Sequence, residues 1–113
     1  MLDRLAGKLE QYMDLLSTRQ KLVASNIANA ETPGFKTKDI DFHSEFQSQM
    51  SGMKPNVIEV SGLKNKNDGN NVDVDREARL LAENALRFSV ASQLAHSEIS
   101  TLRTAIEEGG KTS

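Results

Sequence analysis

The sequence of 113 residues has no cysteine and no tryptophan, and aromatic residues make up only 4% of it. Without cysteine the chain can form no disulfide and offers no thiolate to a metal or a substrate. Because large aromatic core residues are scarce, a β-sandwich or an α/β enzyme is disfavoured. The composition favours a helix-rich protein with a narrow core, and the length suits one domain better than two.

The sequence also lacks a dominant charge and a long apolar run. Its formal net charge is -2, and its lysines and arginines are scattered among acidic residues. We therefore do not expect nucleic acid as a partner. No segment approaches the roughly 18 apolar residues of a membrane span. Since residues 1–16 carry charges every few positions, we also expect no cleavable secretory signal.

Residues that could catalyse a reaction or bind a metal are few and dispersed. The two histidines, His43 and His96, belong to different segments, so a metal site would need ligands from elsewhere. Glu107 and Glu108 lie near the expected end of a helix and have no convergent partners. The glycines form no phosphate-binding loop. We expect no catalytic residue, no metal, no cofactor and no small-molecule substrate.

What the sequence does contain is apolar residues at helical spacing near its start. They step by three and four, apart from one gap at Arg19, and predict a helix from about residue 2 to about residue 30. Such a helix is roughly 43 Å long at 1.5 Å per residue. This first stripe consists of Leu2, Leu5, Leu9, Tyr12, Leu16 and Val23.

A second stripe with uninterrupted helical spacing fills the last third of the chain. It predicts a helix from about residue 75 to 108, roughly 51 Å long. Asp73 or Asp75 can cap its start, and Gly109-Gly110 is expected to end it. The second stripe consists of Leu81, Ala85, Phe88, Ser92, Ala95, Ile99, Leu102 and Ile106, and the row beside it consists of Ala82, Leu86, Val90 and Leu94.

One partner helix cannot cover both rows of the C-terminal helix. We therefore expect the two stripes to pair within one subunit and the neighbouring row to meet adjacent subunits. The predicted fold class is all-α, with two long terminal helices paired as a coiled-coil-like hairpin. A single chain of this kind buries little apolar surface, so we expect the isolated monomer to be loosely folded and assembly to complete it.

The segment between the helices is predicted to be short elements and loops. Thr32-Pro33-Gly34-Phe35 is typical of a type II turn, because proline and glycine suit its two central positions. "FKTKDIDF" has extended character, and a short helix is expected near Asp41, with Phe42, Phe46, Met50 and Met53 on one edge. Residues 51–71 are expected to be a polar connector that is mobile or ordered only by its surroundings. "VIEV" at 57–60 can form a strand, although an isolated strand pair is marginal.

This reading divides the chain into three segments. They are an N-terminal helix at 1–31, a middle part at 32–74 with the turn, short helix and connector, and a C-terminal helix at 75–113. The first and third segments together are expected to form one structural domain.

Two asparagines interrupt the apolar pattern just before the turn. Asn26 lies where the first stripe should continue, and a buried amide there would fix the register of the helix because few alignments satisfy its hydrogen bonds. The alternative interpretation is that Asn26 is merely exposed and that Asn29 belongs to a fraying last turn. The spacing alone leaves both interpretations open.

The residues around these asparagines resemble a known signature. "SNIANAETPGF" at 25–35 is similar to the N-terminal motif of bacterial flagellar axial proteins, and "DGNNVDVDREARLLAEN" at 68–84 resembles the segment that opens the C-terminal helix in short proteins of the proximal rod. "FKTKDIDF" and "LRTAIEEG" are similar too, and only 51–67 is poorly matched. The signature positions are Asn26, Ala28, Asn29, Thr32, Pro33, Gly34 and Phe35, and those of the helix-entry motif are Asp68, Gly69, Asn70, Asn71, Val72 and Asp73.

The resemblance implies a structural subunit of the flagellar basal-body rod, which joins the rotor to the hook. It implies export through the flagellar type III apparatus and a final place across the periplasm. The implied partners are other copies of the chain, other rod subunits, a rotor-side adaptor and the export apparatus. The expected assembly seam consists of Leu5, Leu9, Tyr12, Leu16, Val23, Leu81, Ala85, Phe88, Ala95, Ile99, Leu102 and Ile106.

Two other functions fit some of these observations. A different short rod component has the same function class but another position along the rod. A cytoplasmic export chaperone or helical adaptor is also small and helical, but it has no use for the asparagines and the Thr32-Pro33-Gly34 turn as a unit. An enzyme fits least, because no residue can be assigned to a reaction.

Overall fold

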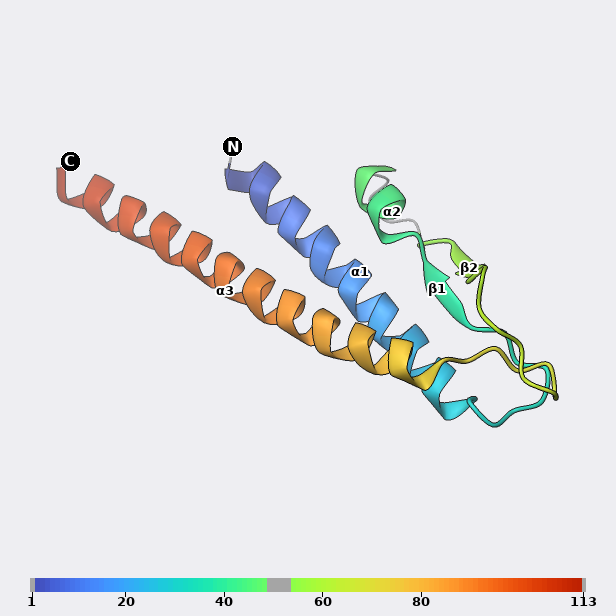
Figure 1. The fold of residues 1–113 in the computed structure, drawn as a ribbon. Coiled ribbons are helices and arrows are strands. Elements are labelled where there is room, and N and C mark those ends of the chain that lie inside the picture. Colours follow the sequence, from blue (N-terminus) through green and yellow to red (C-terminus); the bar gives the residue numbers. More distant parts are fainter. Residues whose placement is uncertain (1, 49–53, 113) are drawn as a thin grey trace.

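The computed structural model describes residues 2–48 and 54–112. Figure 1 shows two long helices lying side by side and antiparallel, so that the start of the first and the end of the second lie at the same end of the molecule. The extents are 72 × 25 × 17 Å. In chain order the elements are α1 (Leu2–Ala28), β1 (Lys38–Ile40), α2 (Phe42–Ser48), β2 (Val57–Glu59) and α3 (Val74–Thr112).

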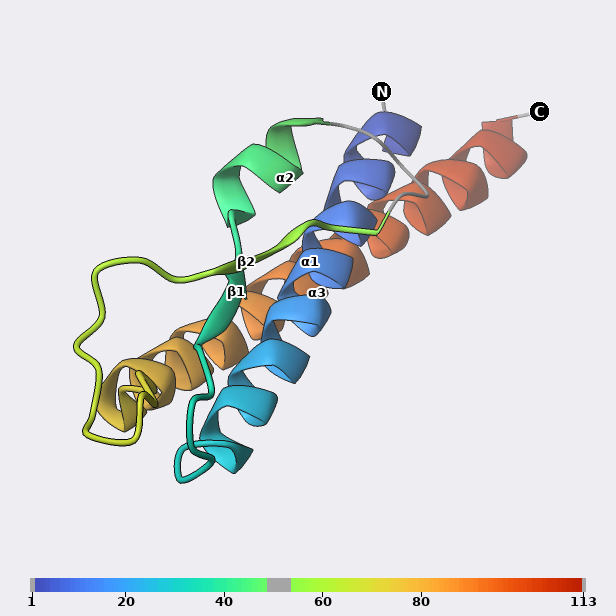
Figure 2. The ribbon, with the colours of Figure 1, turned by 90° about the vertical axis from the view of Figure 1, so that its right-hand side faces the viewer.

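The molecule is elongated, and its fold class is the predicted one. Its radius of gyration is 18.9 Å, whereas a compact domain of this length has about 13 Å. In Figures 1 and 2, α1 lies between α3 on one side and β1 and α2 on the other. The all-α prediction with two long paired terminal helices is therefore confirmed.

The turn after α1 has the predicted type II features. The Phe35 N–H donates to the Thr32 carbonyl at 3.2 Å. Gly34 has a φ of 75°, which a residue with a side chain rarely adopts. Pro33 cannot donate a backbone hydrogen bond and excludes Thr32 from helical geometry, so α1 cannot continue.

The start of α3 follows the prediction and its end does not. The Asp73 carboxylate accepts from the Arg76 N–H at 3.2 Å, so Asp73 is the N-cap. The expectation that Gly109-Gly110 ends the helix is wrong, because α3 continues to Thr112. Glycine lowers helix stability by only about 1 kcal/mol relative to alanine and keeps its backbone N–H.

The connector after residue 53 has defined structure, in keeping with the second of the two expectations for it, that its surroundings order it. Residues Val57–Glu59 form β2 and pair antiparallel with β1, with Asp39 opposite Ile58. Strand β1 in turn lies on α1, which supplies surroundings that an isolated strand pair would lack. Met50 and Met53 lie outside the described residues.

Helix α2 packs on the N-terminal half of α1 through aromatic contacts. The ring of Tyr12 meets Phe42 and Phe46 edge to face at centroid distances of 5.3 Å and 5.6 Å. The Gln11 side chain donates to the Glu45 and Phe46 carbonyls, both at 3.4 Å. These carbonyls belong to the last turn of α2, where no backbone partner is available.

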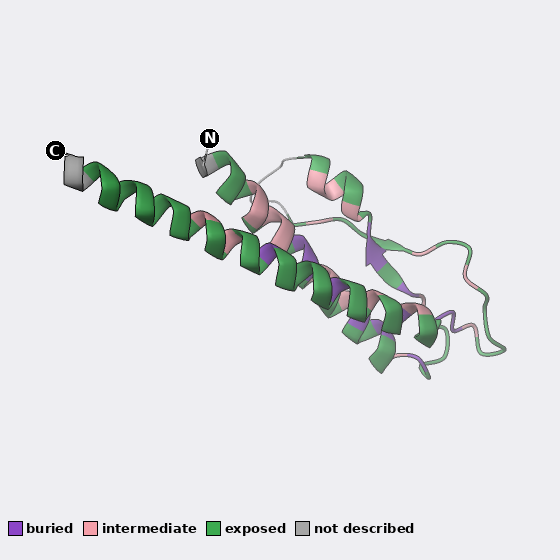
Figure 3. Ribbon diagram, turned by 60° about the vertical axis from the view of Figure 1, so that its left-hand side comes forward, coloured by how far each residue is buried: buried purple, intermediate pink, exposed green. Residues whose placement is uncertain are grey.

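The core is small and unusually polar for its size. Figure 3 shows the buried residues gathered in the half of the molecule next to the loops, whereas α3 is exposed toward its C-terminus. Among the described residues, the buried apolar side chains are Leu15, Leu16, Val23, Ala30, Ile40, Val72 and Ala91, and the buried polar ones are Asn26, Thr37, Asp39, Asn70, Asn71, Glu77 and Asn84.

The predicted pairing of the two stripes holds for part of α1 and is wrong for α3. Leu16 and Val23 are buried in α1, as expected, whereas Leu5 is 49% exposed. In α3 the buried positions are Glu77, Asn84 and Ala91, which are not stripe residues, and the stripe residues one position after Asn84 and Ala91 are exposed. One position corresponds to about 100° of helix rotation. The exposed stripe members include Leu81, Phe88, Ile99, Leu102 and Ile106.

The rotation of α3 has a physical reason. Glu77 and Asn84 face α1 because each finds hydrogen-bond partners there, and a buried polar group without partners would be costly. Small Ala91 lets the helices approach closely. The spacing of large apolar residues, which guided the prediction, marks a different face.

Candidate functional site

The two sequence motifs, about 40 residues apart in the chain, fold onto each other at one end of the molecule. The end of α1 and its turn meet the loop that leads into α3, beside β1 (Figure 1). We call the contacts among residues 19–39 and 65–84 the polar junction. Sequence reasoning identified both motifs but did not predict that they are partners.

Asn70 joins the two motifs from a fully buried position. Its Nδ2 donates to the Asn29 and Thr32 carbonyls, both at 2.8 Å. Its Oδ1 accepts from the Val72 N–H at 2.8 Å. One side chain therefore satisfies two carbonyls at the end of α1 and also shapes the entry into α3.

The backbones of the two motifs also bond directly. The Gly34 N–H donates to the Asp68 carbonyl at 2.9 Å, and the Asn71 N–H donates to the Phe35 carbonyl at 3.2 Å. Gly69 has a φ of 84°, and a Cβ there would lie 3.5 Å from the Gly34 Cα. The positive φ favours glycine at 69, whereas 3.5 Å is an ordinary contact distance that leaves room for a Cβ.

Asn71 and Lys66 extend these contacts to both sides. The Asn71 Oδ1 accepts from the Thr37 N–H at 2.6 Å, just before β1. The Lys66 Nζ donates to the Ala30 carbonyl at 3.1 Å, beyond the end of α1. The connector thus ties down carbonyls and N–H groups that regular secondary structure leaves unpaired.

Asn26 is 1% exposed and connects three elements. Its Nδ2 donates to the Lys38 carbonyl at 2.8 Å, and its Oδ1 accepts from the Lys38 N–H at 3.1 Å. The side-chain amide pairs with β1 as a neighbouring strand would. The same Nδ2 donates to Glu77 Oε2 of α3 at 3.2 Å. This arrangement is what a register role requires, because a shift of α1 would break all three bonds.

Asn29 has a more local environment than Asn26. Its Nδ2 donates to the Ser25 carbonyl at 2.8 Å, and its Oδ1 accepts from the Thr32 hydroxyl at 3.0 Å. Its side chain therefore shapes the end of α1 and the turn, as the alternative interpretation expected. Its carbonyl nevertheless accepts from Asn70, so its backbone belongs to the junction.

A chain of charges crosses the junction beside Asn26. Asp39 of β1 accepts from Arg19 of α1 through both carboxylate oxygens, at 3.1 Å and 3.0 Å. Arg76 of α3 contacts Asp39 at 3.1 Å and Glu77 at 2.7 Å. Asp39 and Glu77 are buried, and each has hydrogen bonds in addition to its ion pair. These additional bonds offset part of the cost of removing the charges from water.

Sequence reasoning missed most of these charged residues. The gap at Arg19 in the first stripe was the available signal, and its cause is now clear, since Arg19 faces β1 and not the other helix. Asn84 was missed as well, and it donates to the Leu16 carbonyl at 2.8 Å and to Gln20 Oε1 at 3.0 Å. No sequence spacing marks these partners, because they lie on three different elements.

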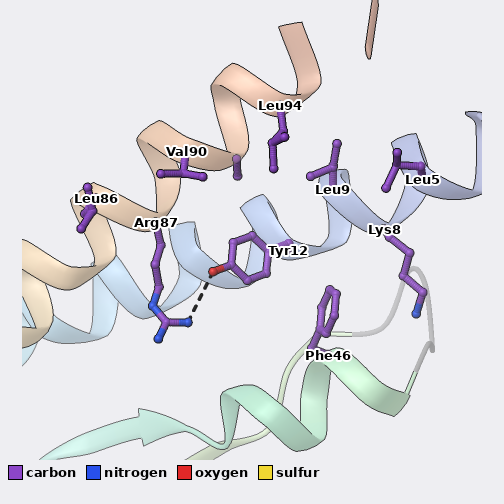
Figure 4. A pocket seen from close by; sticks show the side chains of 10 residues that line it. Leu5, Lys8, Leu9, Tyr12, Phe46, Leu86, Arg87, Val90 and Leu94 are labelled. Atoms are coloured by element: carbon purple, nitrogen blue, oxygen red, sulfur yellow. Dashed lines mark hydrogen bonds between the residues drawn. The ribbon is translucent and has the colours of Figure 1, made fainter. Parts of the chain in front are cut away.

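A second feature lies at the other end of the helix pair. Figure 4 shows an apolar cleft of about 460 Å³ between the N-terminal half of α1, α2 and the middle of α3. Its walls include three members of the row beside the second stripe. The residues that line the apolar cleft are Leu5, Lys8, Leu9, Tyr12, Phe46, Leu86, Arg87, Val90, Ala91 and Leu94.

Two positively charged side chains, those of Lys8 and Arg87, line this cleft. The Lys8 ammonium lies 5.2 Å from the centroid of the Phe46 ring. The Arg87 guanidinium donates to the Tyr12 hydroxyl at 3.4 Å (Figure 4). It also pairs with Glu83. The hydrogen bond with Tyr12 is the largest cause that raises the pKa of Arg87, partial burial opposes it, and the nearby Glu83 raises the pKa further.

Neither region resembles a reaction centre. Within residues 2–48 and 54–112 no group of three or more potential ligands is placed to hold a metal ion. Most polar groups of the junction pair with one another, with the buried Asn84 Oδ1 as an unpaired exception, and the cleft walls are mostly apolar. In the same ranges no helix has the length and apolarity needed to cross a membrane. The geometry can position helices and receive another apolar surface.

Comparison with known proteins points to one family. Residues 13–36 match the model of the family described as "Flagella basal body rod protein". This segment is the part of α1 that enters the polar junction, together with the turn. The match thus falls on residues that the structure places at the junction.

Three similar proteins carry the name "Flagellar basal body rod protein FlgB". The one from Yersinia ruckeri is 31% identical over 137 residues, which cover 96% of this chain and 100% of the relative. The one from Borrelia hermsii is 32% identical over 110 residues, 74% of this chain and 82% of the relative. The one from Escherichia coli (strain K12) is 28% identical over 137 residues, 96% of this chain and 99% of the relative.

Proposed function

Because the chain belongs to the FlgB family of flagellar basal body rod proteins, we propose that it enters the rod as a subunit held in place by its two long helices. Its role is structural, and its relatives are named as rod proteins and not as enzymes. In the proposal, copies polymerise in the proximal rod. The assembled rod then transmits torque from the rotor to the hook.

The observation that carries this proposal is the polar junction. It bonds α1, β1 and α3 through buried amides and carboxylates, so that the two long helices have one alignment. A drive shaft requires identical subunits, because a repeated contact accumulates any variation between copies. We propose that fixing this alignment is the function of Asn26 and of the Asp68–Asp73 motif.

The surface of α3 supplies the second half of the proposal. The stripe from Leu81 to Ile106, which was expected to face α1, is exposed and therefore available to neighbouring subunits. Exposed apolar rows of this kind mark interaction surfaces. We propose that these residues, with Leu5, Leu9 and Tyr12 of α1, form the assembly seam, whereas Leu16 and Val23 serve the monomer core.

The remaining expectations belong to the same proposal. The subunit leaves the cytoplasm through the flagellar type III export apparatus and takes its place across the periplasm. It meets other rod subunits and an adaptor at the rotor side. Residues 1–31 and 75–113 form its structural domain, and residues 32–74 brace that domain through the junction.

Purification of hook-basal bodies tests the proposal. A tagged copy of the protein is expressed in a strain without its own copy, and the protein is expected to restore swimming and to co-purify with the basal bodies. Recovery only from the cytoplasm would favour the chaperone or adaptor function and would overturn the proposal.

A paired substitution tests the role of the junction in the same strain. Asn26→Leu keeps the size of the side chain but removes its three hydrogen bonds, so we expect few or no rods. Asn56→Leu is the matched control, because Asn56 is exposed outside the junction. Equal swimming of the two variants would contradict the register role.

A further inference from the structure

We propose that the apolar cleft receives the C-terminal end of α3 from a second copy of this chain. The proposal rests on the proposed function, since it names the partner of the surface that assembly uses. We call residues 99–109, toward the C-terminal end of α3, the overhang; Figure 1 shows that this end of α3 projects beyond the start of α1. In this arrangement the overhang of one copy packs into the apolar cleft of another copy.

The overhang has no cover within its own chain. From Ile99 to Gly109 every residue is exposed. Ile99, Leu102 and Ile106 are 57%, 43% and 66% exposed and lie on one face, because they step by three and four. An exposed helix of this length gains stability only when its apolar face is packed against another surface.

The cleft presents the complementary surface. Leu86, Val90 and Leu94 are 66%, 49% and 54% exposed, although they line a cleft with aromatic residues from two other helices. They extend over roughly 12 Å along α3, and the three apolar residues of the overhang extend over roughly 10 Å. The two surfaces therefore match in length as well as in character.

Charged residues border both surfaces. Lys8 and Arg87 line the cleft. Residues 98–112 contain three glutamates, Glu98, Glu107 and Glu108, and two basic residues, Arg103 and Lys111, and the glutamates lie directly at the two ends of the apolar row from Ile99 to Ile106. A helix with an apolar face and acidic flanks fits an apolar cleft with basic flanks. Since the overhang itself has this chemistry, a second copy supplies the occupant.

The chain cannot fill its own cleft with its own overhang. Val90 and Leu102 are twelve residues apart on one continuous helix, roughly 18 Å, so they cannot touch within one copy. The contact is necessarily between copies. If each copy gives its overhang to the next one, the contact repeats without closing and extends the assembly.

Disulfide trapping tests the docking. Because the natural chain has no cysteine, only the introduced cysteines can form a disulfide. Purified Val90→Cys protein with an affinity tag is mixed with untagged Leu102→Cys protein and oxidised. Since a disulfide needs Cα atoms within about 7 Å, a mixed dimer forms only if the overhang enters the cleft. Ala82→Cys replaces Val90→Cys in the control, because Ala82 is exposed on α3 but does not line the cleft.

We expect several-fold more mixed dimer from the Val90→Cys pair than from the control pair. Lys8→Glu in the tagged copy is expected to lower this yield several-fold, whereas Lys21→Glu, an exposed position on the same helix, is not. A yield no greater than that of the control overturns the docking. All substituted positions other than Lys8 are exposed, and circular dichroism confirms that each variant keeps its helix content.

The result of the cross-linking experiment does not depend on the result of the hook-basal-body purification that tests the proposed function. Co-purification with basal bodies without cross-linking would leave the rod assignment intact and overturn the docking alone. Cross-linking by a protein that stays in the cytoplasm would support the docking and overturn the rod assignment. A doubly substituted chain, Val90→Cys with Leu102→Cys, gives a ladder of multimers if the contact is open and dimers if two copies exchange overhangs.

Discussion

The two ends of the helix pair are held in different ways. At the junction end, α1 and α3 are connected by buried amides, carboxylates and backbone groups that have partners within the chain. At the opposite end, the same helices carry large apolar side chains that remain exposed, and the end of α3 extends beyond the start of α1. The junction end is complete in one chain, whereas the open end has the composition of a surface that another subunit covers.

This difference separates a part of the chain with a defined shape from a surface that the proposed assembly would use. Polar contacts are directional, so they specify one arrangement of α1, β1 and α3. Apolar contacts are less specific, and they suit surfaces that must meet several neighbours. The following substitutions test the division between the two ends, and each is measured by urea unfolding followed by circular dichroism.

The largest expected effect is at the charge chain of the junction. Asp39→Ala leaves Arg19 and Arg76 without their shared carboxylate, and we expect a loss of about 3 kcal/mol in the free energy of unfolding. Glu83→Ala is the control, since it breaks the exposed pair with Arg87 and should cost only about 0.4 kcal/mol. Similar losses in the two variants would remove the distinction between the junction and the open end.

The second largest effect is expected at the amide that joins the motifs. Asn70→Ala leaves the carbonyls of Asn29 and Thr32 without their side-chain donor, which should cost about 2 kcal/mol. Asn67→Ala, three positions earlier and exposed, should change stability by less than about 0.5 kcal/mol. If both variants were equally stable, Asn70 would not hold the junction together.

Glycine substitutions give a smaller effect with opposite signs at the two ends. Gly69→Ala should lose about 1 kcal/mol, because its φ of 84° is unfavourable for alanine. Gly7→Ala lies inside α1 near the open end, where a Cβ meets nothing within 4 Å, and should gain about 0.5 to 1 kcal/mol. A gain at Gly69 would show that alanine adopts this positive φ without cost.

The smallest effect on the monomer is expected at the overhang. Ile106 is 66% exposed, so Ile106→Ser should change the free energy of unfolding by less than about 0.5 kcal/mol. The same substitution should lower assembly into basal bodies, because it removes an apolar side chain from the proposed contact. A large loss of monomer stability would mean that the overhang already packs within its own chain.

The parts of the fold that follow local rules were predictable from the sequence. Helical spacing located α1 and α3, Thr32-Pro33-Gly34 located the turn, and Asp73 located the start of α3. These features depend on residues within a few positions of one another. The family signature also lay within one short stretch, and the match over residues 13–36 confirmed it.

The features that could not be predicted depend on contacts between residues that are far apart in the chain. The face of α3 that meets α1 was predicted one position away from the actual one, because Glu77 and Asn84 look like surface residues until Asn26 and Leu16 are placed beside them. For the connector the sequence left open whether it is mobile or ordered by its surroundings, because its polar residues show no periodicity. Asn70 and Asn71 order it by bonding to backbone groups at Asn29, Thr32 and Thr37. The looseness of the isolated monomer stays a prediction that thermal unfolding at low concentration can check.

The sequence by itself determined that this is a protein of two long helices with a sharp turn, without catalytic chemistry, and similar to the flagellar axial family. Periodicity, proline, glycine and capping residues act locally, so their consequences can be read along the chain. Only the tertiary structure decided which face of α3 meets α1 and that the two motifs are hydrogen-bond partners. Both outcomes depend on hydrogen bonds between buried polar groups of different elements, and the spacing of residues along the sequence does not show which groups will meet.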